Sequence, residues 1–534
     1  MKAVKFSLAM LAVCIASFAG CSFKTAIYAD RNNTDTDNGN KSPTVITWYW
    51  NESNVQLPED SYICKKIKED LNIVYIHKTP AGTDFEEKLE LLIASGDIPD
   101  VITSYGALTA KLVKWGIARP VEKYLTPEYL PNVIRIQQNW DLAVKYLTAA
   151  DGHVYAVPNC NTPSSMIAEV PFIRYDWLEN LGLGVPRTFE ELREVLVRFT
   201  FDDPDRNGVD DTIGTMANEF WGMVPFALNF GADHFEWYED GNGGVTLGMF
   251  LERHKDYLRY VKSLIDSGAM DRNIATTKFA EIKAKLNAGK VGFLYQWFSH
   301  DDQEEIRKTD PACDWGPITP PAGLYDKGYM PCSGILREGH CVSTRCADVE
   351  AVFRLMDYMA QDKSTDTKMD YTGTYWLMKY GEKGVNWDIT QDGAFTDGKS
   401  GMNPQIAQNN REARWVALAG RFQNRFDIAW RLSLPADVQA MYKQIDSFPL
   451  KVEIPESDSR RPINAESVTL PEDIAAFCME WQLEKWPDFF YRAILGETDI
   501  DKSFENFVTQ ARESGLQEIN EKMEKLLRDI GIIR

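Results

Sequence analysis

Strand-like and helix-like segments alternate after residue 43, and this alternation constrains the fold more than any other feature. Residues 45–50 and 72–77 are rich in Val, Ile, Tyr and Trp, residue types that favour strands. Residues 61–71 between them have the pattern of a helix, and Thr83 with Glu86 forms a capping box that begins another. Such alternation predicts an α/β lobe with a largely parallel sheet.

The same alternation returns after residue 187, which indicates a second lobe. Thr188 with Glu191 forms a capping box, residues 257–265 have helical spacing, and residues 291–295 form an apolar strand. The C-terminal part has mainly helical spacing. A body of about 490 residues is too long for one hydrophobic core, so we expect two lobes. The Pro-rich residues 316–323 are the candidate crossing between them.

The first 43 residues precede the folded body. Residues 1–20 carry Lys2 and Lys5 before a short apolar stretch, as a secretory signal peptide does. The run FAGC ends at Cys21 and resembles a lipobox. We therefore expect a lipoprotein that is anchored to the cell membrane outside the cytoplasm by acyl chains, such as palmitate, on Cys21. Cleavage by an ordinary signal peptidase would still export the chain. Residues 21–43 are polar and predict a flexible tether.

A short acidic segment has the spacing of a calcium-binding loop. Its predicted ligands place side-chain oxygens at loop positions 1, 3, 5 and 9 and a carbonyl at position 7: Asp203, Asp205, Asn207, Asp211 and Val209. Gly208 stands at the sixth position, where the loop turns sharply, and Gly214 replaces the usual Glu of position 12. We expect an isolated structural Ca²⁺ loop rather than a pair of EF-hands. The alternative is a solvated turn.

The charge of the exported chain excludes some partners. Removal of residues 1–20 leaves 56 of the 58 basic side chains against 79 acidic ones, a net charge of −23. Such a surface disfavours nucleic acids and anionic lipid headgroups. No later segment has the length and apolar character of a transmembrane helix, so we expect attachment to the membrane through the lipid alone.

The cysteines give a weak signal. Seven follow Cys21, an odd number without metal-type CxxC spacing. Cys332, Cys341 and Cys346 lie close together in the sequence. A disulfide among them and buried free thiols both stay open.

Five short runs follow one another along the chain: ASGDIPDV at 94–101, DGHVYAVP at 151–158, IRYDWL at 173–178, NAGKVGF at 287–293 and ILGETDID at 494–501. Each run is weak by itself. In this order and spacing, with the calcium loop after the third, they resemble the family 1 extracellular solute-binding proteins of bacterial ABC importers. The similarity is greatest to the large alginate-binding and LipO-like lipoproteins, and it extends over residues 44–530.

The resemblance implies an α/β fold of two periplasmic-binding-protein-like lobes with a ligand cleft between them and a mainly helical C-terminal part. We expect lobe 1 to comprise residues 44–158 and 329–400. Lobe 2, which carries the calcium loop, then comprises residues 159–328 and 401–534. Ligand binding would close the lobes about a hinge, and the closed, monomeric protein would deliver its ligand to ABC permease subunits. The resemblance implies a binding protein and not an enzyme.

Aromatic residues are the candidate ligand contacts. Their rings stack on sugar rings, and open α/β sheets bind ligands at strand ends and in the following loops. A carbohydrate, in particular an oligosaccharide, is therefore the expected ligand. The candidate residues are Trp48, Trp50, Tyr105, Trp221, Trp297, Tyr375 and Trp376. Each could equally belong to the core.

Other functions stay open. A secreted glycoside hydrolase needs two carboxylates in a cleft, and 79 acidic residues allow such a pair, although HExxH, GxSxG, P-loop and GxGxxG motifs are missing from the sequence. A surface adhesin or sugar sensor would use the same fold. A peptide or another polar ligand would suit the same cleft.

Overall fold

The computed structural model describes residues 42–50, 57–78, 85–104, 106–137, 139–149, 151–160, 169–217, 221–297, 301–332, 336–365, 368–391, 393–396, 432, 434–463, 465 and 468–533. The chain divides into two compact units, Met1–Pro43 and Thr44–Arg534. The predictions for the signal peptide, Cys21 and nearly all of the tether lie outside the described residues. Within the described ranges, no helix is both long and apolar enough to cross a membrane.

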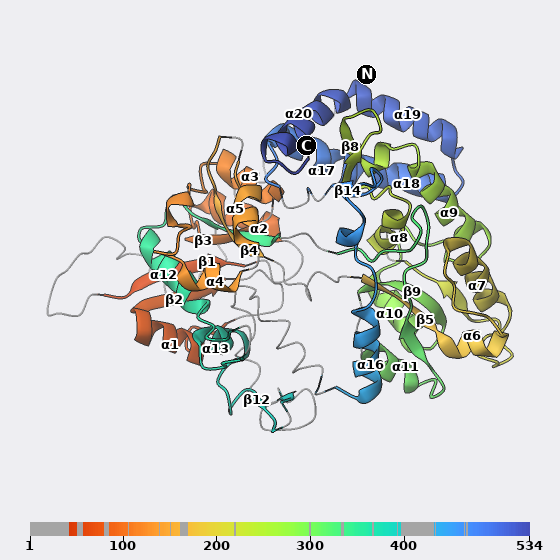
Figure 1. Ribbon diagram of the computed structural model, residues 1–534, viewed down its shortest axis with the longest axis horizontal. Helices are drawn as coiled ribbons and strands as arrows, with labels where there is room; N and C mark the ends of the chain where they lie inside the picture. Colours follow the sequence, from red (N-terminus) through yellow and green to blue (C-terminus); the bar gives the residue numbers. More distant parts are fainter. Residues whose placement is uncertain are drawn as a thin grey trace, which may run out of the picture. The chain divides into compact units, whose positions relative to one another are not determined.

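The first lobe contains a five-stranded sheet with the order β2-β1-β3-β11-β4 (Figure 1). β1 lies parallel to β2 and β3, whereas β11 runs antiparallel to β3 and β4. The strands are β1 (Thr44–Tyr49), β2 (Ile73–Lys78), β3 (Val101–Ser104), β4 (Ala156–Cys160) and β11 (Leu336–Val342). The sheet is thus completed by a strand that the chain reaches only after passing through the second lobe.

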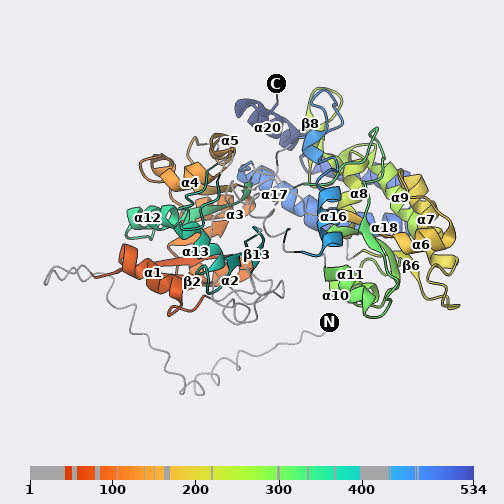
Figure 2. The same cartoon turned by 60° about the horizontal axis from the view of Figure 1, so that its bottom comes forward.

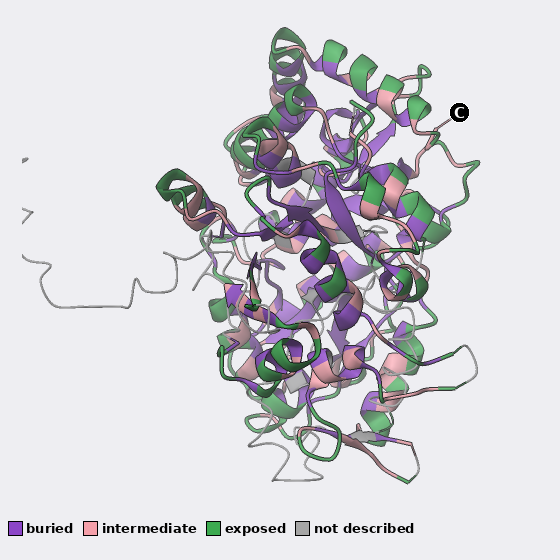
Figure 3. Ribbon diagram, turned by 90° about the vertical axis from the view of Figure 1, so that its left-hand side faces the viewer, coloured by how far each residue is buried: buried purple, intermediate pink, exposed green. Residues whose placement is uncertain are grey.

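Helices surround this first sheet. Its helices are α1 (Tyr62–Leu71), α2 (Phe85–Ser95), α3 (Gly106–Lys114), α4 (Pro131–Ile136), α5 (Trp140–Tyr146), α12 (Val349–Met359) and α13 (Thr374–Tyr380), followed by the hairpin β12 (Asp388–Ile389) and β13 (Phe395–Thr396). The predicted helix at 61–71 is confirmed, and the Ser61 side chain caps it by accepting a hydrogen bond from Cys64 N (3.2 Å). Apolar faces of these helices pack on the sheet, so buried and exposed residues alternate around them (Figure 3).

The second lobe contains a four-stranded sheet with the order β10-β5-β9-β6. β5 is antiparallel to β9 and β10, and only β6 runs parallel to β9. The strands are β5 (Glu169–Arg174), β6 (Ile213–Thr215), β9 (Val291–Trp297) and β10 (Trp315–Pro317). The largely parallel sheet that the alternation predicted holds for β1, β2 and β3 of the first lobe but not for β11, and the sheet of the second lobe is mostly antiparallel. Two neighbouring strands are parallel only when the chain between them crosses over the sheet. β5 is the first strand of the second lobe, so its direction depends on the route by which the chain arrives from the first lobe.

Helices and a small second sheet complete this lobe (Figure 2). α18 packs against α9 and α19, which agrees with the predicted helical C-terminal part. The helices are α6 (Tyr175–Leu181), α7 (Phe189–Phe201), α8 (Val224–Asn229), α9 (His254–Asp266), α10 (Phe279–Asn287), α11 (Asp301–Arg307), α16 (Ala436–Ile445), α17 (Glu472–Glu480), α18 (Trp486–Ile494), α19 (Ile500–Glu513) and α20 (Leu516–Asp529). The small sheet has the order β14-β7-β8, with β7 (Trp237–Glu239), β8 (Val245–Leu247) and β14 (Pro462–Ile463).

Gly292 positions β9 in the core of the second lobe. A Cβ atom at this residue would lie 2.3 Å from Phe199 and 2.9 Å from Trp177. Both rings are fully buried and meet edge to face at 5.2 Å. Because only glycine leaves room for them, α6 and α7 pack directly on the strand.

The Pro-rich segment is not the crossing between lobes. Trp315–Pro317 form the edge strand β10, where proline is tolerated, and Ile318 N donates to Pro171 O at 2.9 Å. Met330 bridges to Leu450 and packs in the same apolar cluster as residues of β5 and β9. Met330 thus belongs to the second lobe, just beyond the expected boundary at residue 329, and the exact bounds of the lobes stay a prediction.

Two of the three cysteines that lie close together in the sequence are buried in the first lobe. Cys341 lies in β11, where its thiol contacts Ser104 Oγ at 3.1 Å. Cys346 is also a buried free thiol. Cys341 and Cys346 therefore belong to the core of the first lobe and form no disulfide with each other.

Candidate functional site

Trp48 and Trp50 lie at the carboxyl end of β1, inside the first lobe. Their rings stack at 5.1 Å, and their exposed fractions are 0 and 3 %. Trp48 Nε1 donates to Thr103 Oγ1 (3.3 Å), which also contacts His340 Nδ1 (3.2 Å). These contacts make both tryptophans core residues in this structure.

Tyr375 and Trp376 are equally enclosed. Both lie in α13 with 1 % exposed, and Trp376 Nε1 donates to Asp362 Oδ1 at 3.0 Å. Aromatic residues bury a large apolar area and therefore enter cores more often than they line ligand sites. Trp48, Trp50, Tyr375 and Trp376 stay predicted ligand contacts. Their burial in this structure argues against that role.

Among the remaining candidates, Trp297 is the one whose backbone lies at the end of a strand. Its backbone ends β9 and pairs with Glu169 at the start of β5. Trp221 begins the short 3₁₀ helix η3 (Trp221–Met223). Tyr105 and the side chains of Trp221 and Trp297 lie outside the described residues. Among these candidates, Trp297 therefore lies at the carboxyl end of a strand, which is where open α/β sheets bind ligands.

A cluster of charged side chains lies at this end of β9. Lys451 Nζ donates to Glu236 Oε1, and the two side chains are only 4 and 6 % exposed. Glu236 Oε2 is buried and has no hydrogen-bond partner within the described ranges. Glu169 is partly exposed, and Asp233 is buried with its Oδ1 accepting from Phe235 N (3.0 Å). We refer to Glu169, Asp233, Glu236 and Lys451 as the buried acidic cluster.

Burial controls the protonation of this cluster. It raises the pKa of Glu169 to about 7, and the nearby Lys451 ammonium lowers it only in part. Burial also raises the pKa of Asp233 to about 8, and the negative charge of Glu236 adds to the rise. Near neutral pH the cluster therefore holds protons, so it offers both hydrogen-bond donors and acceptors.

The predicted calcium loop folds as a tight turn after α7. Gly208 has φ 76°, which confirms the sharp turn at the sixth position, and Asp203 also lies in the left-handed region with φ 48°. The Asp203 carboxylate accepts from Gly208 N (3.1 Å) and Asn207 N (3.1 Å). Asn207 Nδ2 donates to Asp205 (2.9 Å) and Asp211 (3.3 Å).

Lys290 also contacts this loop. Its ammonium lies 3.0 Å from Asp205 Oδ2 and 2.9 Å from Asp211 Oδ1, and it lowers the pKa of Asp211. Carboxylate and amide oxygens are the ligands that calcium prefers. The Lys290 ammonium shows that a positive charge can be held between Asp205 and Asp211. In this structure Lys290 and the Asn207 amide occupy the oxygens of Asp205 and Asp211, so a calcium ion would have to displace both. Within the described ranges, no three Asp, Glu, His or Cys side chains converge to hold a metal ion.

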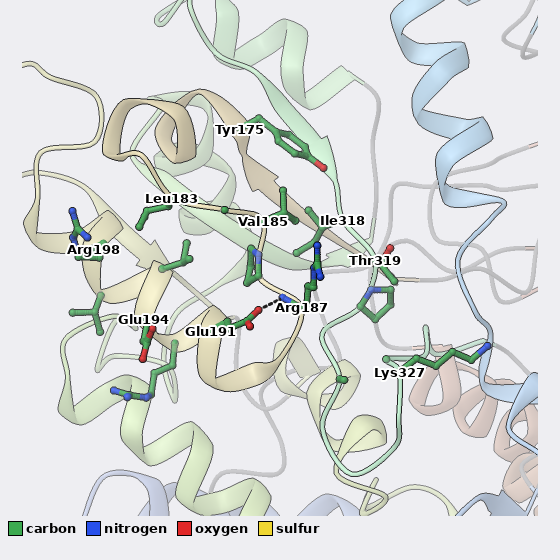
Figure 4. A pocket seen from close by; sticks show the side chains of 18 of the residues that line it. Tyr175, Leu183, Val185, Arg187, Glu191, Glu194, Arg198, Ile318, Thr319 and Lys327 are labelled. Atoms are coloured by element: carbon green, nitrogen blue, oxygen red, sulfur yellow. Dashed lines mark hydrogen bonds between the residues drawn. The ribbon is translucent and has the colours of Figure 1, made fainter.

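A large cavity lies elsewhere in the second lobe (Figure 4). Its volume is about 1220 Å³, and its lining carries both charge signs, for example Arg187 and Glu191. Arg187 N donates to Glu191 Oε2 (2.7 Å) and Tyr175 donates to Pro317 O (2.9 Å). Tyr175 supplies the one aromatic ring among the described lining residues. The cavity therefore offers little for stacking on a sugar ring.

Comparison with known proteins places the chain in a family. The family model described as bacterial extracellular solute-binding protein matches residues 54–366. The fructooligosaccharide ABC transporter substrate-binding protein FusA of Streptococcus pneumoniae is 26% identical over 333 residues. The alignment covers 60% of this chain and 60% of that relative.

Solved structures agree with the fold. An HMO-binding, ABC-transporter-associated solute-binding protein of Bifidobacterium longum infantis has a TM-score of 0.68 at 18% identity, over 92% of this chain and 100% of that chain. The alginate-binding protein AlgQ2 without calcium ion has a TM-score of 0.66 at 20% identity, over 91% of this chain and 98% of that chain. These similarities confirm the predicted two-lobed α/β binding-protein fold.

Proposed function

Because the chain belongs to the bacterial extracellular solute-binding protein family, we propose that it is the substrate-binding protein of an ABC importer for a carbohydrate. Hinge closure of the two lobes captures the ligand, and the closed form docks on the permease. The relationship to FusA, which is named for fructooligosaccharides, supports an oligosaccharide as ligand.

One observation supports particular residues as the ligand site. Glu169, a member of the buried acidic cluster, pairs through its backbone with Trp297 at the carboxyl end of β9. In this proposal Trp297 is the residue that would stack on a sugar, and the partly exposed Glu169 would accept hydrogen bonds from its hydroxyl groups or donate to them. Lys451 is already bonded to Glu236. Because that ammonium is committed to Glu236, it is not offered to the carboxylate of an acidic sugar, so the chemistry of the cluster favours a neutral oligosaccharide.

A calorimetric binding screen tests this assignment. Neutral oligosaccharides are compared with uronate oligosaccharides of the same length, and the ligand that binds is then titrated into Glu169→Gln. We expect a loss of affinity of up to about tenfold, because a hydrogen bond between neutral groups is worth about 0.5–1.5 kcal/mol. Glu190→Gln is the matched control, because Glu190 is exposed on α7 and paired with Arg193.

The outcomes separate the alternatives. Binding of peptides and not of sugars would overturn the carbohydrate assignment, and preference for the uronate would overturn the choice of a neutral sugar. Release of shorter sugars from the bound oligosaccharide would indicate a glycoside hydrolase. Unchanged sugar uptake in a strain that lacks the protein would favour an adhesin or sensor.

Anchoring and calcium complete the proposal. A lipid on Cys21 is tested by mass spectrometry of the membrane-bound protein, with Cys21→Ser expected to release it into the medium. For calcium in the loop of residues 203–211, support comes from the ligand spacing and from AlgQ2, whose structure is described as lacking the ion. We propose a structural role for the ion, because the loop is a turn that follows α7 and contains none of the proposed ligand contacts.

A further inference from the structure

The loop of residues 203–211 has a cation on its own chain. Lys290 Nζ lies 3.0 Å from Asp205 Oδ2 and 2.9 Å from Asp211 Oδ1, and both carboxylates are predicted calcium ligands. We propose that the Lys290 ammonium closes this loop in place of calcium, and that calcium enters only by displacing it. The competition rests on the proposed calcium binding, whereas the closing role of Lys290 does not.

The sheet fixes the position of Lys290. Its carbonyl accepts a hydrogen bond from Ile213 N (2.9 Å), directly before Ile213 pairs with Val291 in the parallel ladder of β6 and β9. The side chain is 28 % exposed, so part of its stem is covered. The backbone register thus places the ammonium beside the end of the loop, and little side-chain freedom has to be lost to hold it there.

The other oxygen atoms of the loop are engaged as well. Asp203 accepts from the backbone of Asn207 and Gly208, and Asn207 Oδ1 accepts from Val209 N at 2.6 Å. The loop is therefore internally bonded with Lys290 in place. To coordinate an ion, it must release the ammonium and redirect the Asn207 amide.

The two cations exclude each other. Both are attracted by Asp205 and Asp211, and a calcium ion between these carboxylates would repel an ammonium at hydrogen-bonding distance. The apparent calcium affinity is then reduced by the fraction of molecules in which Lys290 occupies the loop. Without either cation, the two carboxylates repel each other.

Two variants of the full chain test the proposal. Lys290→Met keeps the length of the side chain and removes the charge, and Lys290→Arg keeps the charge. Lys285→Met is the matched control, because Lys285 is an exposed lysine of the same lobe that pairs with Asp271 at 3.1 Å, away from the loop. Melting temperatures are measured in EDTA and in a series of calcium concentrations, and calcium binding is measured directly by calorimetry.

In EDTA we expect Lys290→Met to melt about 2 °C below wild type, and Lys290→Arg and Lys285→Met to melt close to it. Calcium should restore Lys290→Met, with a half-saturating concentration about tenfold below that of wild type. If Lys290→Met and Lys285→Met melt alike in EDTA, Lys290 does not close the loop. If the calcium affinities of wild type and Lys290→Met agree, or neither protein binds calcium, the competition is refuted.

Discussion

Two clusters in the second lobe combine a lysine with aspartate or glutamate, and they differ in burial. In the loop, Lys290 and Asp211 are 28 and 38 % exposed, and the ammonium lowers the pKa of the carboxylate. In the buried acidic cluster, Lys451 and Glu236 are 4 and 6 % exposed, and the pKa values of Glu169 and Asp233 are raised.

The difference shows that burial, and not the presence of a lysine, decides the protonation of these carboxylates. Water solvates the ions of the loop, so the attraction between opposite charges prevails there. In the buried cluster the loss of hydration outweighs the attraction of one ammonium, and protons remain on Glu169 and Asp233. The first arrangement suits a surface turn, and the second suits hydrogen bonding to the hydroxyl groups of a neutral ligand.

The largest effect is expected for Lys451→Met. It leaves Glu236 buried without its partner, and removal of one member of a buried ion pair costs about 3–5 kcal/mol. Urea unfolding measures this loss. Lys308→Met is the control, because Lys308 is 65 % exposed and pairs with Glu305 on the surface. Similar unfolding of both variants would mean that the buried cluster contributes no more to stability than a surface pair.

The pH dependence should show a smaller effect of the same cluster. The pKa values of Glu169 and Asp233 are raised on folding to about 7 and about 8. The folded protein therefore holds protons that the unfolded chain has released, and the stability they contribute is lost as the pH rises from about 5 to 8. We expect the melting temperature to fall over this range.

Glu169→Gln tests the part that this residue contributes. Glutamine resembles the protonated acid and does not titrate, so the variant should lose less stability between about pH 5 and 7 than wild type. Glu190→Gln, on the exposed face of α7, should leave the slope unchanged. Equal slopes for all three proteins would argue against a raised pKa at Glu169.

The smallest effect concerns salt. At 1 M ionic strength the Debye length is only about 3 Å, and exposed pairs are screened more than buried ones. In EDTA, the difference in melting temperature between wild type and Lys290→Met should therefore shrink by about half from low salt to 1 M NaCl. The deficit of Lys451→Met should persist. Equal screening of both deficits would remove the distinction between the clusters.

The sequence predicts local features of this fold well. The strands near residues 45–50 and 291–295 and the helix at 257–265 follow from side-chain periodicity, which depends on neighbours in the chain. The turn at Gly208 follows from the need for a left-handed residue. The direction of β5 was not predictable in this way, because strand direction depends on the route of the chain between lobes.

The candidate site was predicted less well for the same reason. Lys451 and Glu236 are 215 residues apart, and Lys290 is 79 residues from Asp211. No spacing rule connects such pairs, so only the fold brings them together. Aromatic residues were easy to find in the sequence, but ring type does not distinguish a core position such as Trp48 from a ligand contact.

The order of strands in the first sheet has a consequence for biosynthesis. β4 ends at Cys160 and pairs with β11, which begins at Leu336, so the nascent chain must emerge 176 residues further before this edge can form. Bringing β4 and β11 together closes a long loop, which costs conformational entropy. This cost is smaller if the lobe inserted between the two strands has already folded. We therefore expect a mutation that slows folding of the second lobe to delay the pairing of β4 with β11 as well.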